Sequence, residues 1–500
     1  MVSSIVFAAD QPAATISGRV KRGELRQLAT GVYTSDVDTE PSVVTKREWH
    51  DIVGGMTPGA VITDRSAPTG GPVDGVLYLA HDARDRRISL PGLTVLARRG
   101  AGPLEGDVEL PGGLHQASKG RALAENTRAS RARNQQVRRT LDEPELGDWI
   151  DRLAHIDGDE RLAGYRVQAE QLAESVGAPS SGLAKLSQLI GVALGTQQAG
   201  TSSNALAARQ ARLPYDHDRI TRFDRLITAL RESAPQNRPV LNAEDSHYRE
   251  LPFFEAYFSN FIEGTEFEIQ EAIAIVYAGA QIPGRADDSH DLLGTYRVVA
   301  DLGEMMTRAG SAPEFLSLLR LRHATIIAGR PDKNPGIFKQ ANNQAGSTHF
   351  VDHGLVAGTL SAGWERLREL DTPFERATYM MFLVSEVHPF DDGNGRTARV
   401  MMNAELVGGA QSRIIIPTVY REDYLGALRR LSRQDDPSVL IKALRYAQDY
   451  TAQIDFTDRD EAIAQLTVTN AFNEPNSATS ERLVLPRRRE ETGAATARLP

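Results

Sequence analysis

The fold of this chain is decided by the stretch ATYMMFLVSEVHPFDDGNGRTARVMMNAELVGG, residues 377–409. Its first part, residues 377–387, contains no helix breaker and is apolar on most faces, which predicts a buried helix. His388-Pro389 stops that helix, and helical character resumes over residues 397–407 until Gly408-Gly409. We therefore predict a helix, a tight loop and a second helix.

Glycines and arginines around this loop indicate phosphate binding. Gly393 and Gly395, with Asn394 between them, allow backbone amides to turn inward at the start of the second helix, where the helix dipole is positive. Arg396 and Arg399 are three residues apart and project from one side of its first turn, where guanidinium groups can hold phosphate oxygens. The sequence therefore predicts an anion cradle extended by two arginines.

Two further side chains near the cradle could take part in a reaction. Asp392 suits a hard divalent cation, because Mg²⁺ bound with phosphates uses only one or two protein carboxylates. His388 is the group in the loop that can act as a general base near neutral pH. Any one of these residues could belong to an ordinary surface turn. A base, a carboxylate, a cradle and two arginines within the run 388–399 favour a functional site.

The run HPFDDGNGRTAR, residues 388–399, resembles the signature of the Fic family. The resemblance extends upstream through PGIFKQANNQAGSTHFVDHGLV, which is similar to the family's flap, and downstream through RIIIPTVYREDYLGAL, so that it covers residues from about 240 to 450. Lys339 departs from the pattern, since many relatives have Arg there. The resemblance implies a mainly α fold, in which a helical Fic domain with a small β-hairpin flap follows a mixed α/β N-terminal region.

The resemblance also implies an activity, protein adenylylation (AMPylation). His388 would deprotonate a Ser, Thr or Tyr hydroxyl of a target protein, the hydroxyl would attack the α-phosphorus of ATP, and pyrophosphate would leave. Asp392 would hold Mg²⁺ between phosphate oxygens. The residues implied to bind the phosphates of ATP are Gly393, Asn394, Gly395, Arg396 and Arg399.

A second motif, SNFIEG at residues 259–264, resembles the family's inhibitory signature. By itself the segment is a helix that ends at Gly264, with Glu263 as an ordinary acid. The resemblance implies that Ser259, Glu263 and Gly264 are regulatory and that Glu263 pairs with Arg399. An arginine held by a carboxylate cannot also take the γ-phosphate, so we expect autoinhibition, either within one chain or across a homodimer.

Other functions stay open at this stage. A carboxylate at position 263 could align water for the removal of AMP, and the same site could transfer UMP or phosphate. A DNA-binding regulator with a degenerate site is a further alternative, although the intact motif speaks against degeneracy. His323, His349 and His353 do not form a credible metal site and are expected to be structural.

Length and composition limit the possible number of domains and the possible classes of protein. Its 500 residues favour two or three domains. The absence of cysteine excludes disulfides, thiolate catalysis and Cys-ligated zinc. The net charge of -9 argues against a protein that coats nucleic acid throughout. With no long apolar run and no positively charged leader, we expect a cytoplasmic protein without a membrane segment.

We expect five segments along the chain. Residues 1–120 form a mixed, winged-helix-like region with mostly short strands, and residues 121–196 are helical. The small polar residues 197–212 form a linker. Residues 213–455 form the Fic domain with its inhibitory helix. Residues 472–500, polar and without apolar periodicity, form a disordered tail.

The N-terminal half, including ATISGRVKRGELRQLATGVYTSD, is weakly similar to AbiEi-type antitoxin and regulator proteins. Residues 119–139 carry seven basic residues against one acid, Glu125, and could contact the phosphates of DNA. A solvated helix face with arginines on it explains the same pattern. The sequence therefore leaves open whether this half binds DNA, a target protein or an antitoxin partner.

Overall fold

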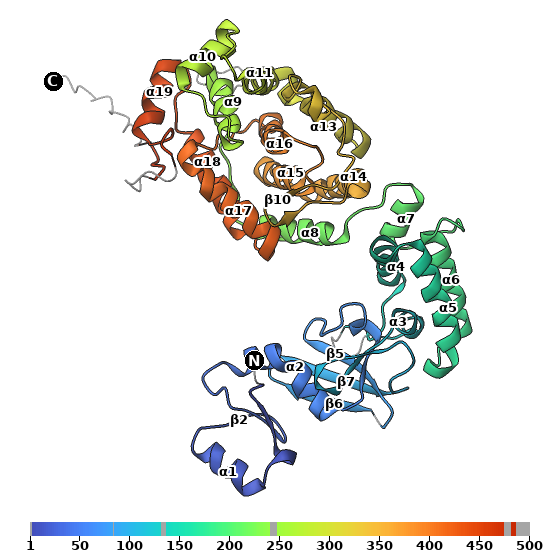
Figure 1. Ribbon diagram of the computed structural model, residues 1–500. Coiled ribbons are helices and arrows are strands. Elements are labelled where there is room, and N and C mark those ends of the chain that lie inside the picture. The colour runs from blue at the N-terminus through green and yellow to red at the C-terminus, as the bar shows by residue number, and fades with distance from the viewer. Residues whose placement is uncertain (1–2, 84, 132–136, 241–247, 475–481, 487–500) are drawn as a thin grey trace, which may run out of the picture. The chain divides into compact units, whose positions relative to one another are not determined.

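A computed structural model describes residues 3–83, 85–131, 137–240, 248–474 and 482–486 (Figure 1). The chain divides into two compact units, Met1–Arg212 and Leu213–Pro500. The structure is mainly helical and has a mixed α/β region at its N-terminal end, which confirms the predicted fold class. In the ranges described, no helix is both long and apolar enough to cross a membrane.

The first unit contains two β-sheets. A small antiparallel sheet has the order β1-β3-β2, and a six-stranded mixed sheet has the order β6-β7-β5-β4-β9-β8, in which β5 pairs in parallel with β7. The apolar residues of β5 and alternate residues of β7 are buried in one core cluster with α2. This burial explains why these segments form strands. The strands are β1 (Ile5–Phe7), β2 (Arg26–Ala29), β3 (Val32–Thr34), β4 (Val61–Ile62), β5 (Val76–His81), β6 (Arg86–Leu90), β7 (Leu93–Arg99), β8 (Val108–Glu109) and β9 (His115–Gln116).

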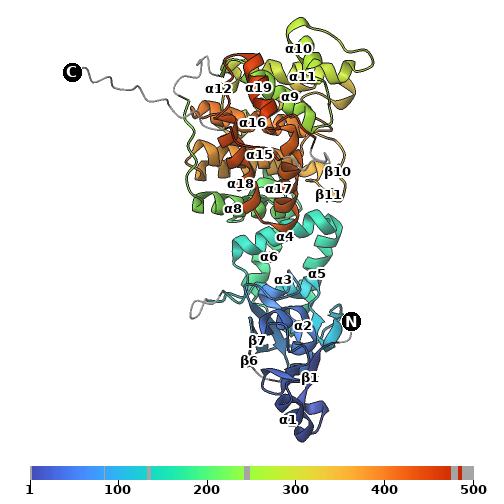
Figure 2. The same cartoon turned by 90° about the vertical axis from the view of Figure 1, so that its left-hand side faces the viewer.

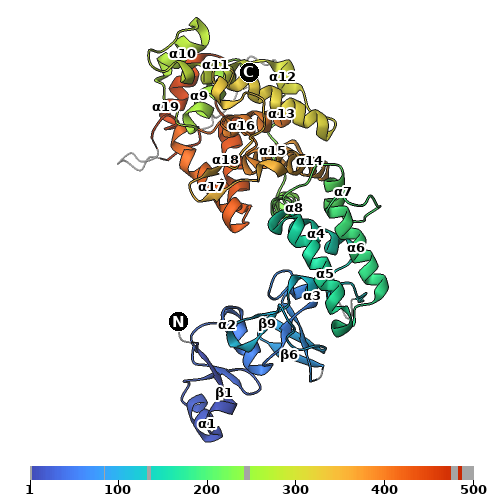
Figure 3. The ribbon, with the colours of Figure 1, turned by 45° about the vertical axis from the view of Figure 1, so that its right-hand side comes forward.

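The described residues of this unit also form the helices α1 (Ala13–Lys21), α2 (Pro41–Met56), α3 (Lys119–Asn126), α4 (Glu143–Asp157), α5 (Asp159–Val176), α6 (Ser180–Ala193) and α7 (Asn204–Gln210). Helices α4, α5 and α6 pack side by side (Figure 3). Helix α7 lies inside the segment expected to be a linker, and it forms because Leu206 is fully buried against α4 and its neighbours. The basic segment expected either to contact phosphate or to form a solvated face begins with α3, where Arg121 is buried and paired with Asp107 at 2.5 Å.

The second unit is built around α15 (Pro373–Val387) and α16 (Asn394–Gly408), which pack against each other in the middle of a ring of helices (Figures 1 and 2). The other helices are α8 (His217–Glu232), α9 (Leu251–Ile262), α10 (Ile269–Ala278), α11 (Ala286–Ala300), α12 (Leu302–Met306), α13 (Ala312–Ile326), α14 (Val356–Arg366), α17 (Arg421–Gln434), α18 (Ser438–Thr451) and α19 (Arg459–Val468). The predicted flap is a hairpin of β10 (Gln344–Ala345) and β11 (Thr348–His349).

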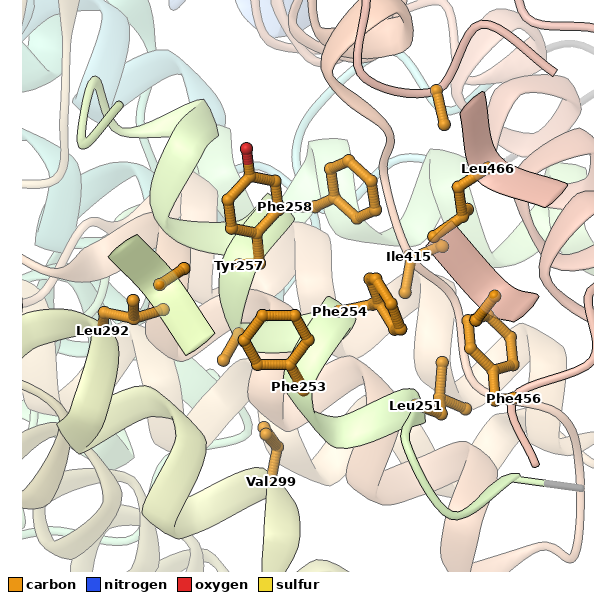
Figure 4. Packing of buried hydrophobic residues seen from close by; sticks show 14 of the residues in the cluster. Leu251, Phe253, Phe254, Tyr257, Phe258, Leu292, Val299, Ile415, Phe456 and Leu466 are labelled. Atoms are coloured by element: carbon orange, nitrogen blue, oxygen red, sulfur yellow. The ribbon is translucent and has the colours of Figure 1, made fainter. Parts of the chain in front are cut away.

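Aromatic residues of α9 form the centre of one core cluster of this unit (Figure 4). Phe253, Phe254 and Phe258 are almost completely buried among residues of α11, α19 and the segment after α16. Burial of a phenylalanine side chain contributes about 2 kcal/mol from the hydrophobic effect alone. The core therefore fixes the helix that carries the second motif, SNFIEG.

The segment expected to be a disordered tail differs in part from that expectation. Phe472 stacks on Phe258 with ring centroids 5.4 Å apart, and Leu483 is buried in the same core cluster. Both side chains are apolar and gain from this burial, although the sequence around them is polar. The rest of residues 472–500, apart from 473–474, 482 and 484–486, lies outside the described residues.

Candidate active site

The predicted loop joins α15 to α16. α15 begins at a capping box of Thr372 and Glu375, and its last residue is followed by His388 in the left-handed conformation, with φ of 52°. Pro389 then prevents further helix. Gly393 has φ of 70° and caps the start of α16, a conformation that glycine adopts without strain. These two turns bring the end of one helix close to the start of the other.

Asn394 holds the loop from inside. Its Oδ1 accepts the N–H of Phe390 at 2.9 Å, and its Nδ2 donates to the carbonyl of the same residue at 2.8 Å. The side chain is 2% exposed, so both hydrogen bonds are shielded from water. The side chain of Asn394 therefore shapes the loop, and its backbone N–H belongs to the first turn of α16.

His323 on α13 supports the loop from outside. Its ring stacks on Phe390 with centroids 3.6 Å apart. Nδ1 accepts the N–H of Gly336 at 2.9 Å, so Nε2 carries the proton and donates to the carbonyl of Asp392 at 2.9 Å. Burial lowers the pKa of His323 to about 4, which keeps the ring neutral. The sequence did not reveal this support, because His323 and Asp392 are 69 residues apart.

His388 is half-buried and stacks on Phe350, which follows the flap, with ring centroids 3.7 Å apart. Its Nδ1 lies 3.4 Å from the carbonyl of Ser385. Burial, assisted by the charge of Lys339, lowers the pKa of His388 to about 4. The ring is therefore neutral at pH 7, and with Nδ1–H directed at the carbonyl, Nε2 is left as a proton acceptor.

The first turn of α16 presents an anion site. Its initial N–H groups, those of Asn394, Gly395 and Arg396, have no acceptor within the helix, as at any helix start. A Cβ added at Gly395 would collide with Oε1 of Glu263. The carboxylate of Glu263 therefore stands directly over the first turn, where the helix dipole favours negative charge.

Arg399 and the SNFIEG motif meet at this point. The guanidinium of Arg399 donates from Nε to Oγ of Ser259 at 3.0 Å and from one NH2 to its carbonyl at 2.8 Å. The same nitrogen forms an ion pair with Glu263 at 2.7 Å. Burial alone would lower the pKa of Arg399, but the charge of Glu263 keeps it raised. Gly264 follows with φ of 89° and ends the motif in a turn. All of these contacts form within a single chain.

Arg396 has different contacts from those of Arg399. It is 2% exposed and forms an ion pair with Asp291 of α11, and NH1 lies 3.4 Å from Oδ1 of Asn260. Arg330 shares the same carboxylate at 2.7 Å. The two arginines of the motif, although three residues apart, therefore have different surroundings, and Arg399 lines the cavity described below while Arg396 does not. No motif or spacing in the sequence indicated that Asp291 is the partner of Arg396.

Asp392 lies beside the cradle. Its Oδ1 accepts the N–H of Gly393 at 2.6 Å and lies 3.5 Å from NH2 of Arg396. The side chain is 36% exposed, so the carboxylate can offer oxygen to a cation that also binds phosphate. Within the described ranges, no group of three or more His, Asp or Glu residues forms a closed metal site. The donor set fits Mg²⁺ that takes one protein carboxylate and completes its shell with phosphate and water.

A cavity of about 400 Å³ joins these groups. His388, Gly395 and Arg399 line it, together with Glu263 and residues of the flap and α17. Its α17 wall includes Tyr424, whose burial raises its pKa. The cavity therefore brings a neutral base, a helix N-terminus and an arginine together.

Part of the chain is similar to known proteins. Residues 316–406 match the Fic/DOC family. The chain is 26% identical over 252 residues to the protein adenylyltransferase Fic of Nematostella vectensis, a match that covers 47% of this chain and 56% of that protein. It is 25% identical over 186 residues to the protein adenylyltransferase fic-1 of Caenorhabditis elegans, with 36% of each covered. The chain thus spans between about a third and about half the length of these relatives.

Among solved structures, a fragment of Fic-1 from C. elegans is similar over 66% of this chain and 90% of that fragment, with 16% identity and a TM-score of 0.36. A Fic-domain protein from Bacteroides thetaiotaomicron is similar over 48% of this chain and 98% of that one, with 18% identity and a TM-score of 0.35. The sequence match covers most of α13, the flap, α14, α15 and most of α16, which are the elements that build the loop and its support. The stretch that matches the Fic/DOC family, residues 316–406, lies within the second unit.

Proposed function

We propose that this protein transfers AMP from ATP to a Ser, Thr or Tyr hydroxyl of a target protein. The observation that carries the proposal is that His388 lines the same cavity as Gly395 and Arg399 at the start of α16. A base beside an anion-binding helix N-terminus is the arrangement that attack of a hydroxyl on a bound phosphate requires. The Fic domain and the names of the adenylyltransferase relatives support AMP as the transferred group.

In the proposed reaction, the target hydroxyl donates its proton to Nε2 of His388 while its oxygen attacks the α-phosphorus of ATP. The bond between the α-phosphorus and the bridging oxygen breaks, and pyrophosphate leaves. His388 suits this role because its pKa of about 4 keeps it neutral, and Phe350 fixes the plane of the ring. Positioning and charge stabilisation supply most of the rate enhancement.

The phosphates of ATP bind at the start of α16 in this proposal. The N–H groups of Asn394, Gly395 and Arg396 face the anion, Gly393 forms the turn before them, and Arg399 orients the outer phosphates. Asp392 would hold Mg²⁺, which neutralises phosphate charge when it is bound. Arg396 acts indirectly, because its pairing with Asp291 anchors α16 and its second NH2 lies near Asp392.

We further propose that Glu263 keeps the enzyme inhibited. Its carboxylate lies over Gly395 and holds Arg399, which is the space and the charge that the γ-phosphate needs. A charge-assisted hydrogen bond of about 1.5 to 3 kcal/mol corresponds to roughly ten- to a hundredfold suppression. Ser259 adds two contacts to the same guanidinium and so holds the arginine in the inhibited position.

One experiment tests the activity and its inhibition together. Wild type and Glu263→Gly are incubated with ATP labelled at the α or the γ position, and the label transferred to protein is measured. Transfer of the α label alone, stronger in the variant, supports AMP transfer. Transfer of the γ label would instead indicate phosphate transfer. Glu266→Gly, which removes an exposed carboxylate three residues away, is the matched control.

A second activity has one observation in its favour. The side chain of Glu263 is 29% exposed and lines the cavity, so its carboxylate could align water against an AMP-modified hydroxyl. Glu263 would then be required for the removal of AMP and inhibitory for its addition. Loss of label from a pre-modified target in the presence of wild type, but not of Glu263→Gly, would identify this activity.

A further inference from the structure

The first unit has a cavity of its own, of about 750 Å³, which the proposed function does not use. Residues of β6, of its neighbour β7 and of the segments 129–131 and 137–139 line it. Among the described residues, the charged members of the lining are one acid, Asp85, and five arginines: Arg86, Arg87, Arg98, Arg131 and Arg139. We refer to this space as the basic cavity, and its excess of cations favours an anionic ligand.

Two of the five arginines are held by buried acids. Arg98 is 9% exposed and forms ion pairs with Asp64 and Glu125, each at 2.9 Å. Arg139 is half-buried, and its Nε lies 3.6 Å from the carboxylate of Asp64. Because Asp64 and Glu125 are completely buried, these pairs are shielded from water. They fix Arg98 and Arg139 within the folded unit.

The other three arginines supply the excess charge. Arg86, Arg87 and Arg131 are all exposed, and the described residues offer no carboxylate in ion-pair contact with any of them. The acid of the lining, Asp85, instead accepts the backbone N–H of Arg99 at 2.6 Å. The basic cavity therefore presents guanidinium groups whose charge-assisted hydrogen bonds are available to a ligand.

Hydrogen bonds hold the segments that carry Arg131 and Arg139. The N–H of Thr140 donates to Oγ of Ser130 at 3.0 Å and so ties the two segments together. The N–H of Arg65 donates to the carbonyl of Arg139 at 2.9 Å. The backbone beside both arginines is thus fixed before a ligand binds, which lowers the entropic cost of binding.

The rest of the lining limits the kind of anion. Tyr78, the aromatic residue among the described lining residues, is 2% exposed and donates to the carbonyl of Val137 at 2.9 Å. None of the large hydrophobic residues exposed in the described chain lines the basic cavity. Protein partners are usually anchored by apolar or aromatic side chains, and single-stranded nucleic acids by bases stacked on aromatic rings. A duplex needs neither, because it presents phosphates along its outside.

We propose that the basic cavity binds the phosphate backbone of a nucleic-acid duplex. The exposed arginines of β6 and of the segment 129–131 contact phosphate oxygens, Arg139 adds a further contact, and Arg98 stays paired with its acids. DNA and RNA duplexes share this chemistry. Contacts to phosphate carry no sequence information, so binding is independent of base sequence.

The test measures the fluorescence anisotropy of a labelled DNA duplex of about 20 base pairs with the full chain, at several salt concentrations between about 50 and 200 mM. Four phosphate contacts predict that the logarithm of the association constant falls with the logarithm of the salt concentration with a slope of about -3.6. The affinity should therefore decrease by about a hundredfold over this range.

Single substitutions locate the contacts. Arg87→Ala and Arg131→Ala each remove one contact, and each should make the slope less steep by about one. Arg161→Ala is the matched control, because Arg161 is an exposed arginine of α5 that does not line the basic cavity. It should leave both slope and affinity unchanged. Circular dichroism confirms that each variant is folded.

An RNA duplex of the same sequence and a polyglutamate chain are measured in the same way. Binding of either duplex with the expected slope supports the proposal, and the tighter of the two identifies the natural source of the backbone. No binding of either duplex at about 50 mM salt, or a slope that Arg87→Ala and Arg131→Ala do not change, would overturn it. Tighter binding of polyglutamate than of both duplexes would also overturn it and would indicate an acidic protein partner. His388→Ala should bind the duplex as wild type does, so this inference is independent of the proposed transfer of AMP.

Discussion

Glu263 and Arg399 form an ion pair 2.7 Å long between the end of α9 and the first turns of α16, within one chain. The pair lies where α16 is positively polarised, and Ser259 holds the same guanidinium through two further hydrogen bonds. The position next to Gly395 admits the carboxylate only because glycine has no Cβ. One set of contacts thus links the SNFIEG motif to the proposed phosphate site, and the proposed inhibition can be tested residue by residue.

We predict that His388→Ala abolishes AMP transfer and leaves ATP affinity largely intact. The base acts in the chemical step, while the amides of α16 and Arg399 still bind phosphate. Single-turnover labelling with α-labelled ATP, combined with a binding measurement, checks this. His353→Ala replaces a histidine of the segment that follows the flap, whose side chain is 47% exposed, and it serves as the control. Substantial labelling by His388→Ala would remove His388 from the chemistry.

The pH dependence of transfer should reflect the lowered pKa of His388. Burial favours the neutral ring, so the base form predominates above about pH 4 rather than above the usual 6.5. Activity of Glu263→Gly should therefore not fall through the titration of His388 between pH 7 and 5, and should be lost as the pH falls through about 4. A rate profile with an acid limb near pH 6.5 would contradict this assignment.

Asp392→Ala should lose the dependence on Mg²⁺ together with activity. Without this carboxylate, no cation is held beside the cradle and the phosphate charge is left uncompensated. Asp391→Ala is the matched control, because Asp391 is the adjacent carboxylate and accepts from Nδ2 of Asn334 at 2.9 Å instead. A titration of activity with Mg²⁺ in both variants is the measurement. The same titration curve in Asp392→Ala and wild type would exclude Asp392 as a ligand.

The sequence predicted the elements around the loop because their signals are local. Pro389, the glycines at 393 and 395 and the apolar runs on either side fix where one helix ends and the next begins. The structure agrees, with α15 ending at Val387 and α16 starting at Asn394. The flap could be predicted only through the family resemblance, since its strands have two residues each.

The surroundings of the site could not be predicted from the sequence, because they arise from packing between distant segments. Asp291 and Arg396 are 105 residues apart, and no spacing rule relates them. Helix periodicity placed Arg396 and Arg399 on one side of α16, but it does not say which neighbour each guanidinium meets. The partners of Glu386 could not be predicted either. In the sequence it is a polar residue in a largely apolar helix, and its contacts with α8 and α17 form only when these helices pack against α15.

His323 should contribute to stability in a manner that depends on pH. Its pKa is about 4 in the folded protein and about 6.5 in an unfolded chain, so unfolding takes up a proton between these values and stability falls as the pH decreases from 6.5 to 4. His323→Ala should lower the free energy of unfolding by about 2 to 4 kcal/mol at pH 7, because it removes two buried hydrogen bonds and the contact with Phe390. Its Tm should also change less with pH over this range, as scanning calorimetry would measure.

Glu263→Gly should raise self-labelling from α-labelled ATP by about ten- to a hundredfold, through the release of Arg399 rather than through a looser fold. The substitution frees the guanidinium for the γ-phosphate, so the gain requires both the arginine and the third phosphate. Arg399→Ala should therefore cancel most of the gain, and the two substitutions should be strongly non-additive, as expected for groups that share one interaction. Circular dichroism and the Tm of each variant separate this effect from unfolding. Additive effects would mean that the ion pair does not control activity. If Glu263→Gly is folded and shows no gain in labelling, the SNFIEG motif is not inhibitory and is an ordinary helix end.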